Sequence, residues 1–201
     1  MSRLLSDRAE KTANVVLLQA SLEDPKKAPP GLYRIGLLAT CGSIFAFFTA
    51  LIVAYCWRAG TPPYWDRIPL PPTLWLSTGL ILAASGSFEA ARRVFGKGNR
   101  HLALRFLIIA GLLGLGFLGS QFTAWRELVE YGAFLSQNPH SSFFYLFTGL
   151  HAIHLLGGLA ALMVVMIRRS PRRELVDVVA YYWHFLAILW IALFATLSLV
   201  S

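Results

Sequence analysis

The chain has 201 residues, of which 56% are hydrophobic and only 14% are charged, with a mean hydropathy of +0.58. Soluble domains usually carry about 25% charged residues, so this composition excludes an ordinary soluble protein and predicts a membrane protein. The formal net charge of +8 does not indicate nucleic-acid binding, because that function needs a basic face on a soluble fold.

The apolar runs predict five transmembrane helices behind a polar tail. Residues 1–33 form a charged, proline-rich tail, and residues 34–201 form the transmembrane domain. Apolar runs near 20 residues are long enough to cross a hydrocarbon core of about 30 Å. The expected spans are residues 35–57, 73–91, 102–124, 142–167 and 178–200, and the polar segments between them, including the basic segment 92–101, are expected to be loops.

The positions of the basic residues predict the orientation of these helices. Fifteen of the 18 Lys and Arg residues lie in the tail, in the second and fourth connections, or beside them. The positive-inside rule therefore places the N-terminus in the cytoplasm and the C-terminus outside, in the periplasm of a bacterial inner membrane. Tryptophans lie near the expected outer boundary, as amphipathic rings prefer; they are Trp57, Trp65, Trp75 and Trp125.

One polar stripe interrupts the fourth span. Thr148, His151, His154 and Gly158 recur at positions i, i+3, i+6 and i+10, which places them on one side of a helix. Polar groups are costly in lipid, so this stripe is expected to face other helices and to hydrogen-bond with them. An alternative hypothesis is a haem ligated by His154 and His184, but the two residues are expected at depths that differ by about 10 Å.

The spans lack other residues that would indicate chemistry. His151 and His154 have no acidic residue at their depth to complete a metal site, so no metal ligand is assigned. The centres of the spans carry neither a carboxylate nor a cation, which proton relays and ion carriers generally need. We identify no catalytic residue, and these residues alone predict a helical bundle with a structural or interaction role.

Several motifs, taken together, resemble subunit III of haem-copper oxidases, in its five-helix form. The resemblance covers about residues 32–200, in order, at matching spacing. Its motifs are Phe143-Phe-Tyr-x-x-Thr148-Gly-x-His151-x-x-His154-x-x-x-Gly158, then Tyr182-Trp183-His184-Phe185 with Trp190, and Gly116-Phe-x-x-x-Gln121, Arg34-x-Gly36, Thr78 and Ala83-Ala-Ser-Gly86. The chain departs from the family at three positions where a carboxylate is common, which are Ile44, Ala124 and Ala187.

This resemblance implies a non-catalytic subunit of a cytochrome c oxidase, which reduces O2 to water and pumps protons. The subunit would carry no redox centre, bind phospholipid, stabilise the catalytic subunit and support its proton uptake. Its expected partners are the catalytic subunit I, which holds haems and copper, the copper-bearing subunit II, and a larger respiratory supercomplex. The alternatives are a homologue from a quinol oxidase or a nitric oxide reductase, and, more remotely, a haem-b membrane anchor.

Two groups of residues are then expected to matter. An interhelical polar seam would comprise Thr148, His151, His154, Gly158, Tyr182, Trp183, His184 and Gln121. Cations at the inner boundary would contact lipid headgroups, since anionic headgroups attract basic side chains, or would serve only to set the topology; these cations are Arg92, Arg93, Arg168 and Arg169.

Overall fold

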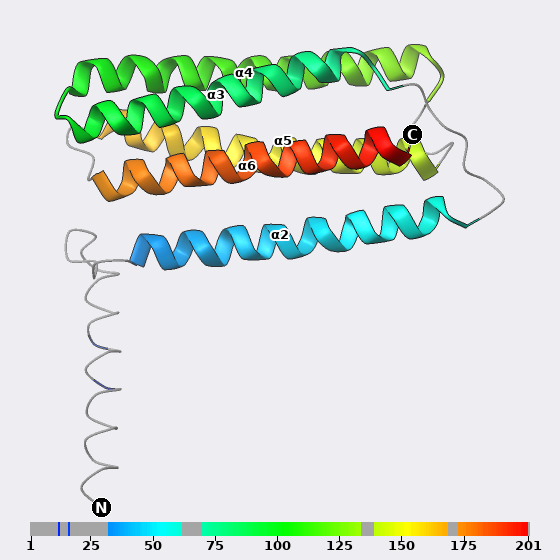
Figure 1. Ribbon diagram of the computed structural model, residues 1–201, viewed down its shortest axis with the longest axis horizontal. Helices are drawn as coiled ribbons and strands as arrows, with labels where there is room; N and C mark the ends of the chain where they lie inside the picture. The colour runs from blue at the N-terminus through cyan, green and yellow to red at the C-terminus, as the bar shows by residue number, and fades with distance from the viewer. Residues whose placement is uncertain are drawn as a thin grey trace, which may run out of the picture. The chain divides into compact units, whose positions relative to one another are not determined.

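The computed structural model describes residues 12, 16, 32–61, 70–133, 139–168 and 173–200. These residues contain α-helices and no strand, so the predicted all-α class is confirmed for them. The helices are α2 (Leu32–Ala59), α3 (Thr73–Gly96), α4 (Arg100–Glu130), α5 (Pro139–Ile167) and α6 (Arg173–Val200) (Figure 1). Apart from Thr12, Val16, Leu32 and Tyr33, the expected tail lies outside the described residues.

Four of these helices are long and apolar enough to cross a membrane, namely α2, α4, α5 and α6. Each has at least 28 residues, which corresponds to about 42 Å of helix and exceeds the thickness of a hydrocarbon core. Helix α3 is shorter, with 24 residues, and carries more Ser, Thr and Gly. The chain is therefore a membrane protein with four helices of spanning character among its described residues, and the expected fifth crossing depends on α3.

The helices extend further than the apolar runs predict. Helix α3 continues through Arg92 and Arg93 to Gly96, and α4 begins at Arg100, so the expectation of a loop over residues 92–101 is wrong for most of that segment. The turn between them is tight because Gly98 adopts a left-handed φ of 81° and the Asn99 side chain accepts a hydrogen bond from the backbone N–H of Leu102. Hydropathy identifies the part of a helix that can lie in lipid. The helical hydrogen bonding continues into the polar residues that follow, so the helix is longer than its apolar run.

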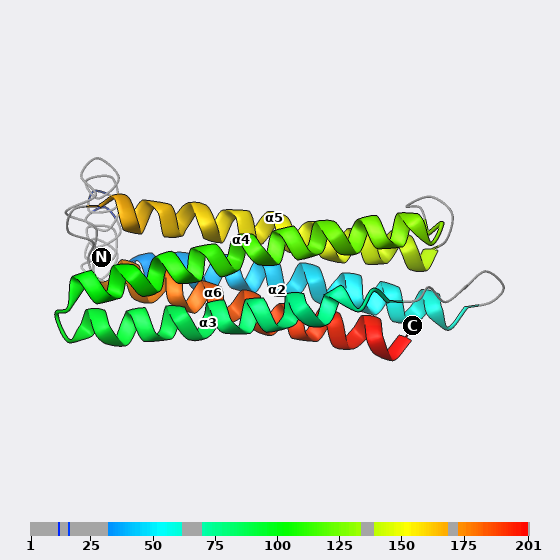
Figure 2. The same cartoon turned by 90° about the horizontal axis from the view of Figure 1, so that it is seen from above.

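The structure divides into two units, residues 1–39 and residues 40–201, and α2 begins in the first and ends in the second. Within the second unit, α3 packs against α4 and α6, and α5 packs against the same two helices. Helices α3 to α6 therefore close into a four-helix bundle whose successive members run in opposite directions (Figures 1 and 2).

Residues 40–59 of α2 contact α5 through aromatic rings. The Phe48 ring lies 5.6 Å from the His154 ring, and the Tyr55 ring lies 5.5 Å from the Phe147 ring, both edge to face. The buried side chains of α2 are Ile44, Phe48 and Tyr55, while the rest of this segment is largely exposed. Exposed apolar side chains on such a helix are expected where lipid or another membrane protein covers them.

The polar side chains of α3 bond to the neighbouring helices. The Ser77 and Ser120 hydroxyls lie 2.7 Å apart between α3 and α4, and the Ser87 hydroxyl donates to the carbonyl of Phe106 at 2.8 Å. On the opposite side, the Trp190 indole N–H of α6 donates to the Thr78 hydroxyl at 3.0 Å. These bonds satisfy polar groups that lipid could not. The polar side chains that lower the hydropathy of α3 are therefore accommodated by bonds to the neighbouring helices.

Candidate functional site

The stripe on α5 faces its neighbours at three levels. Trp125 of α4 donates its indole N–H to the Thr148 hydroxyl at 2.9 Å, and Thr148 donates to the carbonyl of Phe144 at 2.8 Å. At the other end, the Trp183 indole N–H of α6 donates to the Gly158 carbonyl at 3.3 Å. Thr148 and Gly158 are buried, and a Cβ at Gly158 would lie 3.3 Å from Trp183 Nε1, so this glycine permits a close approach of α6.

His151 lies at the centre of this stripe and is fully buried. Its ring packs between the Trp190 ring at 5.3 Å and the Phe117 ring at 5.5 Å, measured between centroids. Within the described ranges, neither ring nitrogen has a hydrogen-bond partner, so the expected hydrogen bond from His151 to a neighbouring helix is wrong there. The contacts that surround the ring are aromatic, and neither Phe117 nor the indole ring face of Trp190 offers a conventional acceptor.

His154 bonds within its own helix. Its Nδ1 lies 2.7 Å from the carbonyl oxygen of Leu150, one turn earlier on α5. The contact to α6 at this level comes from the backbone instead, since the Tyr182 hydroxyl donates to the His154 carbonyl at 3.1 Å. The expected hydrogen bond from the His154 ring to another helix is therefore replaced by a bond to the preceding turn.

Gln121 on α4 belongs to the same level of the bundle. It lies one turn from Phe117, which contacts His151, and one turn from Trp125, which contacts Thr148, so it shares the stripe of α4 that faces α5. Its side chain is 1% exposed, and neither amide atom has a partner within the part of the chain that the structure describes. Gln121 and His151 are thus two buried polar side chains without a partner among the described residues.

The ring of His184 on α6 bonds to another helix. Its Nδ1 lies 2.6 Å from the Ser85 hydroxyl of α3, and its Nε2 lies 3.5 Å from Oε2 of Glu89. The geometry suits a ring that accepts from the serine hydroxyl at Nδ1 and directs an N–H at Nε2 toward the carboxylate. His184 therefore connects α6 to α3 at two points separated by one turn of α3.

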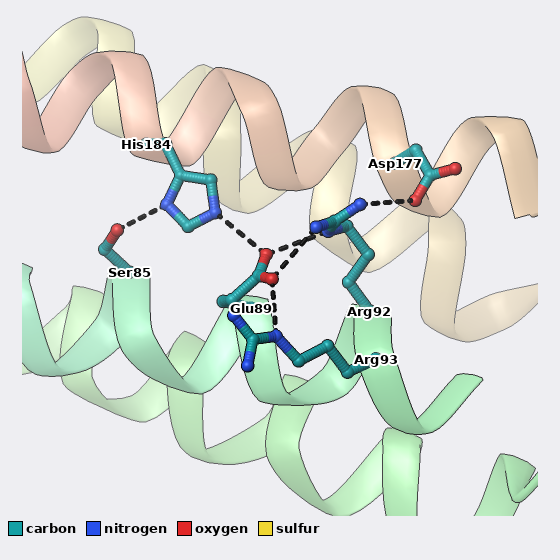
Figure 3. A network of polar contacts seen from close by, with 6 residues as sticks. All are labelled: Ser85, Glu89, Arg92, Arg93, Asp177 and His184. Atoms are coloured by element: carbon teal, nitrogen blue, oxygen red, sulfur yellow. Dashed lines mark hydrogen bonds and ion pairs between the residues drawn. The ribbon is translucent and has the colours of Figure 1, made fainter. Parts of the chain in front are cut away.

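Glu89 is the centre of a larger group, which we call the α3–α6 polar network: Ser85, Glu89, Arg92, Arg93, Asp177 and His184 (Figure 3). The Glu89 carboxylate accepts two bonds from Arg92, at 2.8 and 2.9 Å, and one from Arg93 at 2.7 Å. Arg92 also lies 3.7 Å from Asp177 of α6 and over the Tyr181 ring at 5.5 Å. Two-point binding of a guanidinium by a carboxylate is among the stronger polar contacts in proteins.

The four expected headgroup cations differ in what surrounds them. The Arg92 side chain is 28% exposed and bonded within the network, whereas Arg93 is 73% exposed and extends outward. Arg168 is exposed at the end of α5, and its carbonyl accepts a bond from Arg100 at 2.9 Å. Arg169 lies outside the described residues.

The positions where the family commonly has carboxylates are all buried here. Ile44 on α2 is 7% exposed, Ala124 on α4 is 0% exposed, and Ala187 on α6 is 3% exposed. Each apolar side chain belongs to the hydrophobic core of the bundle. The chain therefore has packed apolar side chains at these three positions.

No group of three or more His, Cys, Asp or Glu side chains that could hold a metal ion occurs among the described residues. The ring nitrogens of His154 and His184 face different groups, the Leu150 carbonyl and the Ser85–Glu89 pair respectively. The His154 ring bonds within α5, whereas the His184 ring joins α6 to α3.

The sequence does not single out three residues of the network as functional candidates: Ser85, Glu89 and Asp177. The spacing of Glu89 to Arg92 and Arg93, at i+3 and i+4, is a usable signal for ion pairs on one helix. The contacts to Asp177 and His184 had no local signal, because they join residues about 90 positions apart in the sequence.

The comparisons with known proteins agree with this architecture. Residues 33–200 match the model of a protein family described as cytochrome c oxidase subunit III. A probable cytochrome c oxidase subunit 3 of Mycobacterium tuberculosis is 32% identical over 182 residues, covering 85% of this chain and 89% of the relative. A counterpart in Nocardia farcinica is 33% identical with the same coverage, and the cytochrome c oxidase subunit 3 of Corynebacterium diphtheriae is 30% identical, covering 86% and 90%.

Proposed function

Because the chain belongs to the cytochrome c oxidase subunit III family, we propose that it is a non-catalytic subunit of a respiratory haem-copper oxidase. The oxidase would take electrons from cytochrome c, reduce O2 to water and pump protons through its catalytic subunit. The observation that carries the proposal is the family match over residues 33–200, which spans the whole described bundle. The shared motif residues on α5 and α6 supply contacts between helices, as at Trp183 and Gly158.

The proposed topology has five membrane crossings, with the N-terminus in the cytoplasm and the C-terminus outside. Helix α3 would be the fifth crossing, although its composition alone does not identify it as one. Its bonds to α4 and α6 support this placement, because satisfied polar groups are tolerated in lipid. The named relatives come from bacteria, which favours the bacterial cytoplasmic membrane as the location.

The proposed partners are the catalytic subunit I, the copper-bearing subunit II and a larger respiratory supercomplex. In that assembly the chain would stabilise the catalytic subunit and support its uptake of protons. The polar seam on α5 would hold the bundle in one arrangement, because interhelical hydrogen bonds specify which helix faces which. Because Ile44, Ala124 and Ala187 carry no ionisable group, we propose that any such support depends on other positions.

Phospholipid binding is part of the same proposal. Arg93 and Arg168 are suited to contact lipid phosphates because both are exposed at the end of a helix. Arg92 is less suited, because its guanidinium is bonded to Glu89 and lies beside Asp177. Arg169 stays a candidate on its sequence position alone.

Affinity purification of the tagged chain from native membranes tests the proposal. Mass spectrometry of the eluate should identify a haem-copper catalytic subunit and a copper-bearing subunit, and the complex should show oxidase absorbance. The purified chain alone should show no b-type haem spectrum. A b-type haem bound to the isolated chain would instead support a haem-b membrane anchor, and recovery with a quinol-oxidising subunit would change the assigned electron donor.

A further inference from the structure

The α3–α6 polar network is partly exposed at a depth that a membrane would cover (Figure 3). The side chains of Glu89 and His184 are 23% and 28% exposed. From this exposure, and from the shape and charge beside it, we propose that α3 and α6 together dock one transmembrane helix of a different subunit, which carries an acidic side chain near its cytoplasmic end. The surface, which we call the docking face, comprises Gly79, Leu82, Gly86 and Glu89 of α3 with His184 and Ile188 of α6.

The depth of the two polar groups follows from the helix lengths. Glu89 lies seven residues before the end of α3, or about 10 Å along the helix, and His184 lies eleven residues into α6, or about 16 Å. With both helices centred in a hydrocarbon core of about 30 Å, the two side chains lie between about 7 and 10 Å inside it. Lipid tails cannot hydrogen-bond to a partly exposed carboxylate or imidazole, whereas a packed helix would shield both from lipid.

Two glycines leave room for such a helix beside the network. Gly79 and Gly86 are exposed, and a Cβ added to either would have nothing within 4 Å. They lie two turns apart on one side of α3, and Glu89 follows Gly86 by three residues on the same side. In lipid, small residues on a helix surface allow the backbone of another helix to approach closely. Neither glycine contacts another helix of this chain, so the space beside them is open to a partner.

The inner end of the docking face is positively charged. Arg93 lies seven residues after Gly86, and Lys97 follows one turn later, at the end of α3. Both residues are exposed, and they continue the side of α3 on which Gly79 and Gly86 lie. An Asp or Glu near the cytoplasmic end of the docked helix would face Lys97. Complementary charges of this kind determine which helix binds and in which register.

The same charges argue against a second copy of this chain as the occupant. Copies in one membrane have the same orientation, so a symmetric pair joined through α3 would place Lys97 of one copy at the level of Lys97 of the other. Like charges brought together at an interface are unfavourable. The occupant is therefore a helix of another subunit. This inference rests on the proposed function, which supplies a partner in the membrane, and it names the surface that the partner contacts.

Photocrosslinking in native membranes tests the docking face. A photoreactive phenylalanine analogue replaces Leu82 or Ile188 in the full chain, and the crosslinked peptides are identified by mass spectrometry. The matched control is the same replacement at Ile153 of α5, which is also exposed but lies outside the docking face. Both docking-face positions should crosslink to one transmembrane peptide of another subunit, with Asp or Glu near its cytoplasmic end. Crosslinking of that peptide from Ile153 should be several-fold weaker.

A pair of glycine variants tests the close approach. Gly86→Leu should lower the recovery of the crosslinked subunit with the tagged chain about ten-fold, because its side chain enters the space of the docked helix. Gly119→Leu on α4 should leave the recovery unchanged, although Gly119 is equally exposed and has nothing within 4 Å of an added Cβ. Neither variant should lower the thermal stability of the isolated chain, since leucine favours a helix over glycine.

A charge variant tests the inner end. Lys97→Glu should reduce the recovery several-fold, and Lys97→Arg should retain it. Crosslinking from the docking face only to lipid, or only to a second copy of this chain, would overturn the proposal. Recovery of partner subunits that is the same for Gly86→Leu and the wild type would overturn it while leaving the proposed function intact. A wild-type chain that recovers no other subunit would overturn both.

Discussion

Trp183 of α6 lies directly against Gly114 of α4, where a Cβ atom would stand 2.6 Å from Cη2 of the indole. The same indole donates its N–H to the Gly158 carbonyl of α5 at 3.3 Å. Trp183 is fully buried, so it fills the space among three helices that both glycines leave open. The contact between α4, α5 and α6 therefore depends on two positions without side chains.

We predict that Gly114→Ala lowers the thermal stability of the chain. Alanine usually favours a helix by about 1 kcal/mol over glycine, but displacing a fully buried indole costs about 1–3 kcal/mol. The net expectation is a loss of about 1 kcal/mol. Gly119→Ala is the matched control, because Gly119 lies on the same helix with nothing within 4 Å of the added Cβ. Thermal unfolding in detergent should move in opposite directions for the two variants, and a shift of the same sign would contradict the contact.

We predict that Glu89→Gln weakens the association of α3 with α6. The change removes the charge that binds Arg92 and Arg93 and that faces the His184 ring. Bonds to charged groups contribute about 1.5–3 kcal/mol when shielded, and partial exposure reduces this to roughly 1–2 kcal/mol.

Thermal unfolding measured at low and high salt checks this prediction. The loss should be smaller at high salt, because salt screens partly exposed charges. Glu130→Gln, at an exposed position near the end of α4, should leave the stability unchanged. Equal effects of the two variants would show that the α3–α6 polar network does not stabilise the bundle.

Much of the helical architecture could be predicted from the sequence, and the side-chain partners could not. Apolar runs locate the helices because lipid requires them to be continuous. Their ends were missed at Arg92 and Arg93, since charged residues can extend a helix beyond the lipid when they bond within it, as both do with Glu89. The family itself was predicted correctly from the spacing of its motifs.

The polar stripe on α5 shows where the sequence stops being informative. Its periodicity correctly indicates an inward-facing row at Thr148, His151 and Gly158, which are buried, whereas His154 of the same row is partly exposed. Periodicity cannot say whether an inward-facing nitrogen meets a donor, an acceptor or a ring. His151 meets the Phe117 and Trp190 rings, and His184, which lies on another helix, meets Ser85. These partners depend on how helices distant in the sequence pack.

We predict that His151→Phe does not lower the thermal stability of the isolated chain. Phenylalanine keeps the ring contacts with Phe117 and Trp190, and it removes two nitrogens that have no partner among the described residues. Leaving such groups buried and unpaired costs about 1–3 kcal/mol, so the variant should be as stable as the wild type or more stable.

His184→Phe provides the contrast, because it removes the contacts to Ser85 and Glu89 and should lower the unfolding temperature. Thermal unfolding of both variants, each purified alone and within its complex, distinguishes the two roles. A clear loss of stability in His151→Phe would mean that its ring nitrogens bond to a group outside the described residues.

We predict that Thr78→Val loosens the contact between α3 and α6 at the far end from Glu89. The Thr78 hydroxyl accepts the indole N–H of Trp190 at 3.0 Å and donates to the Leu74 carbonyl at 2.9 Å. Valine has nearly the same shape but leaves the buried indole N–H without an acceptor, which costs about 1–3 kcal/mol.

Thr196→Val is the matched control, because its hydroxyl donates within its own helix, to the Ala192 carbonyl at 2.8 Å. The indole N–H of Trp190 also reports the change directly, since its amide-region NMR signal should exchange faster with solvent in Thr78→Val and not in Thr196→Val. Unchanged exchange together with unchanged stability would show that the bond between Thr78 and Trp190 does not hold α3 to α6.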